Sequence, residues 1–325
     1  MGASKEQIVE ALGASPFRPL AWARNRHAQT LFPHFARREL APPTRSERWP
    51  RDDGDELSVH HKEGDGPRLV VFHGLEGSVS SGYVIGLLRA FPCVTVMEHR
   101  SCDGRINQAK RLYHLGETTD LDFVVRELVR REPQRKLLLC GFSLGANQLL
   151  KWLGESAPAV PEQVAGAFAV SAPFDLLVSG PNLDKVLWGQ YTKHFLKTLV
   201  PKALAKADQF PGVLDTEKIR TATTFAAFDT YGTAALHGFV DAKDYWRRVS
   251  SGQFLPAIET PTVLLSSADD PFNPGSTLPR ELARVHPYLI PQFTERGGHV
   301  GFVAGTLKRP RYWAEEQLAT FMRLL

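Results

Sequence analysis

The pentapeptide GFSLG at residues 141–145 is the feature that most constrains the fold of this chain. An apolar run, residues 136–140, precedes it, and a stretch of helical character, residues 146–153, follows it. Strand, sharp turn and helix in this order are typical of a nucleophile elbow, whose serine has strained backbone angles. Glycines two positions before and after Ser143 leave such a turn free of side-chain bulk. A serine that only caps the helix is the alternative, but the flanking strand and helix favour a nucleophile.

Composition narrows the class of protein further. A chain of 325 residues suits one large α/β domain with an insertion. Its 43% hydrophobic and 23% charged residues indicate neither disorder nor a fibrous repeat. The formal net charge is only +4 and the basic residues are scattered, so we expect no nucleic-acid partner. Because no apolar run approaches about 18 residues and residues 1–13 have no apolar core, we expect no membrane segment, no secretion signal and a cytoplasmic location.

Cysteines and histidines outside the elbow give little support to metal or thiol chemistry. The chain has three cysteines: Cys93, Cys102 and Cys140. Their odd number and spacing favour reduced thiols, and Cys140 lies on an expected buried strand, where a catalytic thiol has little support. The competing candidates for a metal site are His60, His61, His73 and His99. They lack helical spacings such as HExxH, so we expect no metal and no cofactor.

Continuous apolar runs alternate with amphipathic stretches through most of the chain. The expected strands are residues 68–72, 93–97, 136–140, 164–170, 262–266 and 287–293, after a hairpin at 47–62. The expected helices are residues 4–12, 83–90 and 119–131, with another after the elbow. This alternation predicts an α/β fold with a mostly parallel sheet and helices on both faces.

The domain organisation follows from where this alternation stops. Residues 176–250 show no clear strand-helix unit and are rich in aromatic residues, so we expect a helical cap insertion there. Most of these aromatic side chains need only pack the insertion onto the core, while a minority should line an apolar pocket. We therefore expect an N-terminal helix and arm at 1–45, a core at 46–175 and 251–325, and a cap at 176–250.

A serine hydroxyl is a weak nucleophile, so Ser143 needs a base and a group that orients the base. Asp269 and Asp270 follow the strand at 262–266, and His299 stands in a glycine-rich segment further on. The order serine, aspartate, histidine is that of the α/β-hydrolases. We expect His299 to be the base and Asp270 the orienting acid, with Asp269 as its rival and Asp175 as a more distant candidate.

Acyl transfer also needs hydrogen-bond donors for the negative charge that develops on the carbonyl oxygen. Leu144 directly follows the serine, so its backbone N–H should provide one donor at the start of the helix. Leu75 lies in the loop after the strand at 68–72 and should provide the other. A plain turn at the end of that strand is the alternative.

The chain as a whole resembles the YheT-like α/β-hydrolases, which include yeast medium-chain fatty-acid ester synthases and animal lipid hydrolases. The motifs that carry the resemblance lie at residues 25–30, 73–78, 100–104, 113–118, 141–151, 236–239, 269–272 and 297–302. The resemblance implies an α/β-hydrolase fold, an esterase-like activity on acyl esters and a triad of Ser143, Asp270 and His299. It places residues 100–104 in the family core rather than in catalysis. Ser101 stands where the family usually has glycine, and Ala146 stands where glycine is common.

We therefore predict a serine hydrolase that cleaves carboxylic esters, with medium-chain acyl groups, through an acyl-enzyme. The expected binding partner of the protein is its substrate, a small-molecule acyl ester. Transfer of the acyl group to an alcohol is an alternative that uses the same residues. A lipid-binding protein without catalysis is a third hypothesis, because a fold does not by itself imply a function. The sequence leaves acyl length, alcohol group and oligomeric state open.

Overall fold

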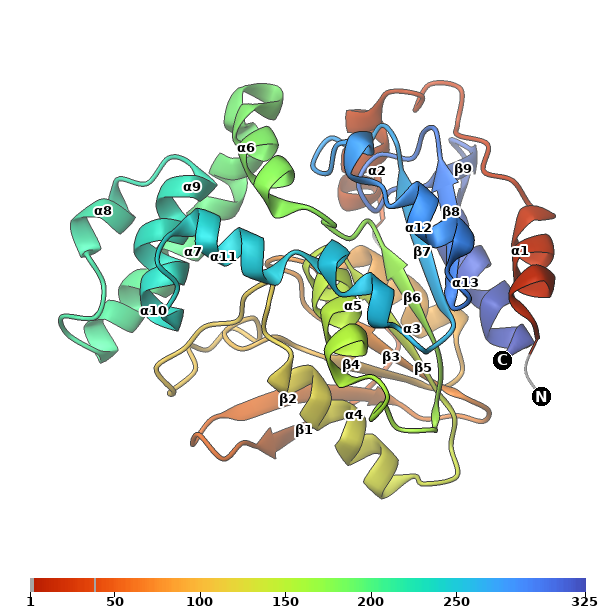
Figure 1. Ribbon diagram of the computed structural model, residues 1–325, viewed down its shortest axis with the longest axis horizontal. Helices are drawn as coiled ribbons and strands as arrows, with labels where there is room; N and C mark the ends of the chain where they lie inside the picture. The colour runs from red at the N-terminus through yellow and green to blue at the C-terminus, as the bar shows by residue number, and fades with distance from the viewer. Residues whose placement is uncertain (1–2, 38) are drawn as a thin grey trace.

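An eight-stranded sheet forms the centre of the computed structural model, which describes residues 3–37 and 39–325 (Figure 1). Its strands are β1 (Arg45–Pro50), β2 (Glu56–Lys62), β3 (Arg68–Phe72), β4 (Val94–Met97), β5 (Leu137–Phe142), β6 (Val164–Val170), β7 (Thr262–Ser267) and β8 (Leu289–Thr294). They are ordered β1-β2-β4-β3-β5-β6-β7-β8. The strands from β3 to β8 are parallel to one another, while β1 and β2 form an antiparallel edge next to β4. The expected mostly parallel sheet and N-terminal hairpin are confirmed.

Helices cover both faces of this sheet. The core helices are α1 (Lys5–Gly13), α3 (Gly82–Ala90), α4 (Thr119–Arg131), α5 (Leu144–Ser156), α12 (Arg280–Val285) and α13 (Trp313–Leu324). Apolar side chains of α4, α5 and α12 pack on one face, and those of α1, α3 and α13 pack on the other. Every residue of β3 and β5 is buried, which explains why these strands read as continuous apolar runs.

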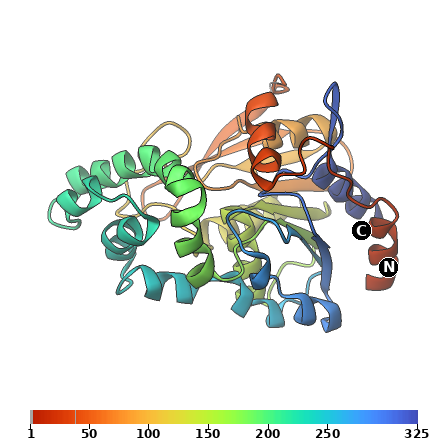
Figure 2. The same ribbon diagram turned by 90° about the horizontal axis from the view of Figure 1, so that it is seen from above.

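Between β6 and β7 the chain forms a helical insertion that lies to one side of the sheet (Figures 1 and 2). It contains α6 (Leu176–Lys185), η1 (Val186–Gly189), α7 (Gln190–Gln209), α8 (Thr216–Arg220), α9 (Phe225–Phe228), η2 (Asp229–Ala234), α10 (Ala235–His237) and α11 (Ala242–Val249). Its aromatic and aliphatic side chains form a separate buried cluster. Single helical turns follow at η3 (Ser251–Gln253), η4 (Leu255–Ala257) and η5 (Gly275–Thr277). No helix in the described ranges is both long and apolar enough to cross a membrane.

The N-terminal arm contains a second helix, α2 (Arg26–Ala36), that the sequence analysis did not separate from the arm. Asn25 caps this helix by accepting hydrogen bonds from the N–H groups of its first turn. The buried Gln29 side chain donates to Val303 O at 3.1 Å and accepts from Val303 N at 2.7 Å. These bonds attach α2 to β9 (Val303–Thr306), which pairs with β10 (Arg309–Tyr312) in a small hairpin. The arm is therefore bound to a segment far along the chain.

Candidate active site

Ser143 lies in the turn between β5 and α5, with φ 51° and ψ −111°. Such angles are strained for a residue with a side chain. The surrounding backbone leaves no space for side chains on the flanking glycines. A Cβ on Gly141 would lie 2.6 Å from Ala146 Cα, and a Cβ on Gly145 would lie 2.3 Å from Phe72 O. The expected strand, turn and helix are present, and the turn depends on both glycines.

The structure brings Ser143, His299 and Asp270 together in one hydrogen-bonded chain. His299 Nε2 lies 2.9 Å from Ser143 Oγ, and His299 Nδ1 lies 2.8 Å from Asp270 Oδ2. Asp270 is 3% exposed, and its other oxygen accepts from Phe272 N at 2.7 Å and Asn273 N at 3.1 Å. The Phe272 ring stacks on the imidazole with ring centroids 4.2 Å apart. This is the geometry of a nucleophile, a base and an orienting acid.

The two rival acids occupy other positions. Asp269 Oδ1 accepts a hydrogen bond of 3.0 Å from Gly298 N, in the loop that carries His299. Asp175 caps α6, where its side chain accepts from Leu177 N at 2.9 Å. The carboxylate that contacts the imidazole is thus the one expected from sequence, while its neighbour holds the backbone beside it.

The loop that carries His299 is supported from the N-terminal arm, a contact that the sequence analysis did not anticipate. His299 N donates to Thr30 Oγ1 at 2.9 Å, and Val300 N donates to Ser171 Oγ at 3.0 Å. Gly298 has φ 62°, and a Cβ there would lie 2.8 Å from Thr30 Oγ1. Helix α2 therefore packs directly on the backbone of the base. The only sequence signal for this role was the arm motif at residues 25–30.

The loop after β3 contains a backbone donor, the N–H of Leu75, between two N–H groups that tyrosine hydroxyls hold. Gly74 N donates to Tyr83 Oη at 2.9 Å, and Glu76 N donates to Tyr113 Oη at 2.9 Å. Within the described residues, the N–H of Leu75, which lies between them, donates to no protein acceptor. Tyrosine hydroxyls thus fix the N–H groups on both sides of Leu75.

Leu144 is in a similar position at the start of α5. The first N–H groups of a helix have no acceptor within it, and Leu144 N donates to no acceptor in the part of the chain that the structure describes. Leu75, Leu144, Ser143 and His299 line the same cavity. Two N–H donors and a nucleophile that share one cavity can hold a carbonyl oxygen as it becomes negative.

Among the alternative metal and thiol candidates, His61, His73, His99 and Cys140 are buried, and His60 is partly buried beside Glu98. His73 Nδ1 lies 2.8 Å from Gly74 O, and His73 Nε2 accepts from His99 N at 3.1 Å. Burial lowers the pKa of His73 well below its usual value and that of His99 to about 4, so both rings are neutral at pH 7. Burial raises the pKa of Cys140 well above its usual value, which disfavours the thiolate. Across residues 3–37 and 39–325, no three metal-ligating side chains form a group.

An apolar cavity of about 130 Å³ extends from Ser143 between the sheet edge and the helical insertion. Most of its wall comes from the helices of the insertion, with side chains that include Leu176, Leu183, Phe195, Leu199, Phe225 and Phe228. An apolar wall of this kind suits a hydrocarbon chain attached to the reacting carbonyl.

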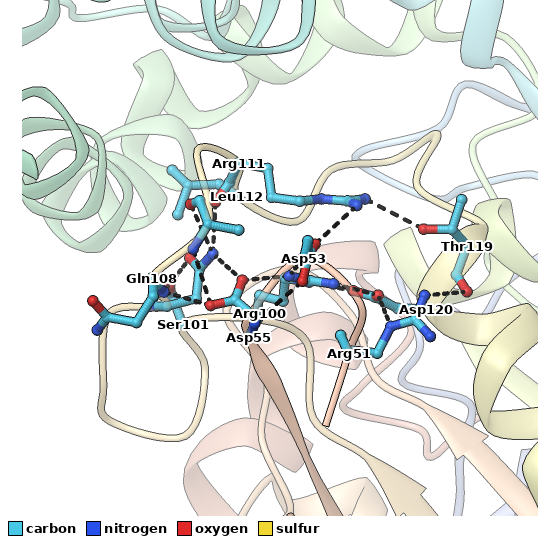
Figure 3. Close-up of polar contacts among 12 residues, drawn as sticks. Arg51, Asp53, Asp55, Arg100, Ser101, Gln108, Arg111, Leu112, Thr119 and Asp120 are labelled. Atoms are coloured by element: carbon cyan, nitrogen blue, oxygen red, sulfur yellow. Dashed lines mark hydrogen bonds and ion pairs between the residues drawn. The ribbon is translucent and has the colours of Figure 1, made fainter. Parts of the chain in front are cut away.

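A second buried polar cluster supports the loop at residues 101–118 (Figure 3). This loop forms part of the cavity wall. The Arg100 side chain is fully buried and contacts three carboxylates. Arg100 Nη1 lies 2.8 Å from Asp53 and also pairs with Asp55, while Nε lies 2.6 Å from Asp120. These carboxylates raise the pKa of Arg100, so its charge is permanent. Asp55 also accepts from backbone N–H groups of the loop.

Comparison with known proteins gives consistent matches. The alpha/beta hydrolase fold family matches residues 67–305. YheT of Escherichia coli, an esterase by name, is 34% identical over 96% of this chain and 94% of its own. A monoacylglycerol lipase of Saccharomyces cerevisiae is 30% identical over 79% of this chain and 59% of its own length. The solved structure of the Pyrococcus furiosus esterase Pf2001 superposes with a TM-score of 0.55 over 86% of this chain and 90% of its own, at 15% identity.

Proposed function

Because the chain belongs to the alpha/beta hydrolase family, as an esterase- or lipase-type member similar to YheT, we propose that it cleaves medium-chain acyl esters through an acyl-enzyme. The observation that carries this proposal is the hydrogen-bonded chain from Ser143 through His299 to Asp270. Ser143 and Asp270 each lie within hydrogen-bond distance of His299, and Ser143 and His299 line one cavity.

In the proposed mechanism, Ser143 Oγ attacks the ester carbonyl while His299 Nε2 takes its proton. Asp270 orients the imidazole and stabilises its positive charge. His299 then gives the proton to the departing alcohol, which leaves the acyl group on Ser143. Water, activated by the same histidine, releases the acid and restores the enzyme.

We propose that the N–H groups of Leu75 and Leu144 stabilise the oxyanion in both steps. Two observations support this role. Neither N–H group donates to another acceptor among the described residues, and both residues line the cavity with Ser143. Donors already in place need no reorganisation when the charge develops, which is the main source of stabilisation in such sites.

The proposed substrate class follows from the cavity and from the insertion. We propose that residues 176–250 act as a cap over a core formed by 46–175 and 251–325, since the helices of the insertion supply most of the apolar wall. Each acyl CH₂ removed from water contributes about 0.8 kcal/mol. Relatives named monoacylglycerol lipase and phospholipase act on lipid esters by their names, which agrees with an acyl pocket of this kind.

Labelling with a fluorophosphonate tests the nucleophile directly, because a serine paired with a base reacts readily. We expect covalent modification of Ser143 alone, located by peptide mass spectrometry, and none in Ser143→Ala. Modification of another serine, or no reaction of the folded protein, would overturn the proposal.

Esters of increasing acyl length test the pocket. We expect kcat/KM to rise several-fold for each two carbons from acetyl toward medium chains, because each CH₂ enters an apolar wall. A flat series would show that the insertion does not bind the acyl chain. Product analysis with added alcohol separates hydrolysis from acyl transfer: a new ester as main product would favour the transferase alternative.

A further inference from the structure

Two of the sequence motifs have no part in the catalytic mechanism, and the structure brings a histidine from each of them together. His114 lies in the loop at 101–118, and His237 lies at the end of α10 in the insertion. Their ring centroids are 4.4 Å apart, and both residues line the cavity that contains Ser143. The pair therefore joins the core and the insertion within the proposed substrate pocket.

Backbone contacts determine which nitrogen of each ring carries the proton. Gly116 N donates to His114 Nδ1 at 3.1 Å, and Leu112 N donates to His237 Nε2 at 3.4 Å. A ring nitrogen that accepts a hydrogen bond carries no proton, so a neutral ring is protonated on the other nitrogen. Burial lowers the pKa of His114 well below its usual value and that of His237 to about 4, so both rings are neutral at pH 7. His114 Nε2 and His237 Nδ1 are thus N–H donors.

Neither donor is used by the protein within the described residues. No hydrogen bond there involves His114 Nε2 or His237 Nδ1. They are also not sealed off: the unpartnered side-chain atoms that are closed to solvent in this part of the chain belong to His61, Gln148, Ser179 and Ser266. Each ring thus has an unused donor that is open to solvent, and both residues line the apolar cavity, where a ligand oxygen can accept from them.

The pair lies at some distance from the reacting carbonyl. Gln148, on α5, donates to His114 O at 2.8 Å. Gln148 is five residues beyond Ser143, which corresponds to roughly 7.5 Å along a helix axis. A group held by the histidine pair is therefore a second polar group of the substrate. Lys202, a cation on the same cavity wall, is paired with Glu76 at 2.6 Å, so this wall suits an uncharged oxygen.

We propose that His114 and His237 form a polar subsite that donates two hydrogen bonds to a second, uncharged oxygen of the ester substrate. The inference rests on the proposed esterase function and specifies its substrate class: esters with a hydroxyl or carbonyl oxygen besides the ester group. That oxygen belongs either to the alcohol, as in a glycerol ester, or to the acyl chain, as in a hydroxyacyl ester.

Three esters of equal acyl length test the subsite: the plain ethyl ester, the glycerol ester and the ethyl ester of the hydroxyacyl chain. We expect the wild-type protein to favour an oxygenated ester over the plain one by kcat/KM. His237→Phe should lower the ratio of kcat/KM for the oxygenated ester to kcat/KM for the plain ester about three- to tenfold, because it removes one neutral hydrogen bond. His237→Asn should retain most of it, because its side-chain NH₂ lies near the position of Nδ1. In the control, Phe239→Leu, the ratio should not change, since Phe239 contacts the His114 ring without a hydrogen-bonding group.

The arms of the experiment identify the source of the oxygen. If His237→Phe lowers kcat/KM only for the glycerol ester, the oxygen belongs to the alcohol. If it lowers kcat/KM only for the hydroxyacyl ester, the oxygen belongs to the acyl chain. Equal losses on all three esters, or a wild-type protein without preference, would overturn the subsite. Absence of both turnover and fluorophosphonate labelling would instead overturn the esterase proposal. The subsite is then tested by the thermal shift of Ser143→Ala protein, which should be larger with an oxygenated ester than with the plain ester.

Discussion

Two buried polar clusters, one at Ser143 and one around Arg100, differ in whether all of their hydrogen-bond donors have partners. The Arg100 guanidinium is enclosed by three carboxylates on its Nε and both Nη atoms. At Ser143, the serine lines a cavity together with Leu75 and Leu144, whose N–H groups donate to no acceptor among the described residues. A saturated network stabilises a structure, whereas one with open donors can bind a reacting group.

The charges of the clusters differ as well. Arg100, Arg51 and Arg111 pair with the carboxylates of the cluster around Arg100, whereas at the serine one carboxylate faces an imidazole. Removing one partner of a buried ion network leaves uncompensated charge and costs stability. Removing a member of the serine cluster should cost catalysis instead. Mutations in the two clusters therefore separate these effects.

The largest effect should come from Ser143→Ala. We expect kcat to fall on the order of 10⁶-fold, as for other serine hydrolases that lose the nucleophile, since no other group forms the acyl-enzyme. The midpoint of urea unfolding should remain nearly unchanged. Turnover of a medium-chain ester measures the first quantity. A residual kcat within about 100-fold of wild type would place the nucleophile elsewhere.

The next largest effect should come from Asp270→Asn. We expect kcat to fall on the order of 10⁴-fold, because the amide no longer holds the imidazole in the required tautomer. Asp269→Asn is the matched control, since Asp269 contacts the loop backbone at Gly298 N. The fall in kcat of this control should be far smaller. If the ranking of the two kcat values were reversed, Asp269 would be the orienting acid.

Arg100→Met should show the opposite pattern. We expect the free energy of unfolding to fall by roughly 3–5 kcal/mol, because three carboxylates lose a buried partner. In the control, Arg126→Met, the change should be at most about 1 kcal/mol, since the pair of Arg126 with Asp122 is largely exposed. Urea unfolding compares the two variants. A large loss of kcat in Arg100→Met at unchanged stability would contradict a purely structural cluster.

The smallest effect should come from Thr30→Val, which removes the acceptor of the His299 N–H. The loss of one hydrogen bond, worth about 1 kcal/mol, should lower kcat several-fold. KM should remain nearly constant because Thr30 does not line the cavity. Thr30→Ser should restore kcat, since it retains the hydroxyl. Equal changes in kcat and KM for all substrates would argue against a role in positioning the base.

The sequence was sufficient to predict the sheet, the elbow and the residues that meet there. Apolar strands and the GFSLG turn are local patterns, and their positions agree with β3 to β8 and with the start of α5. The contact between Thr30 and His299 could not be predicted in this way, because it joins residues 269 positions apart without any local pattern. The contact between His114 and His237 could not be predicted for the same reason. Each ring belongs to a different motif, and only the tertiary structure brings the two rings together.

Ser101 shows a further limit of reading from sequence. The resemblance to YheT-like hydrolases implies glycine at this position, and the φ of 62° at Ser101 is one that glycine adopts without strain. The serine instead makes two hydrogen bonds with Asn107, at 2.8 and 3.1 Å. The sequence shows that serine replaces the glycine that the resemblance implies. Only the structure shows the hydrogen bonds that the serine makes there.

The contact between the arm and the base also has a consequence for the order in which the protein becomes active during synthesis. Ser143 leaves the ribosome long before His299, and the backbone of His299 rests on Thr30, which is made earlier still. Domains generally fold as units during synthesis, so the late segment must be made before this part of the fold can form. By the proposed mechanism the nascent chain therefore carries an inert serine, and α2 must wait for the segment at 297–303 before it can dock. By the same mechanism, ester hydrolysis needs the segment that carries His299, so it can begin only after nearly the whole chain has been made.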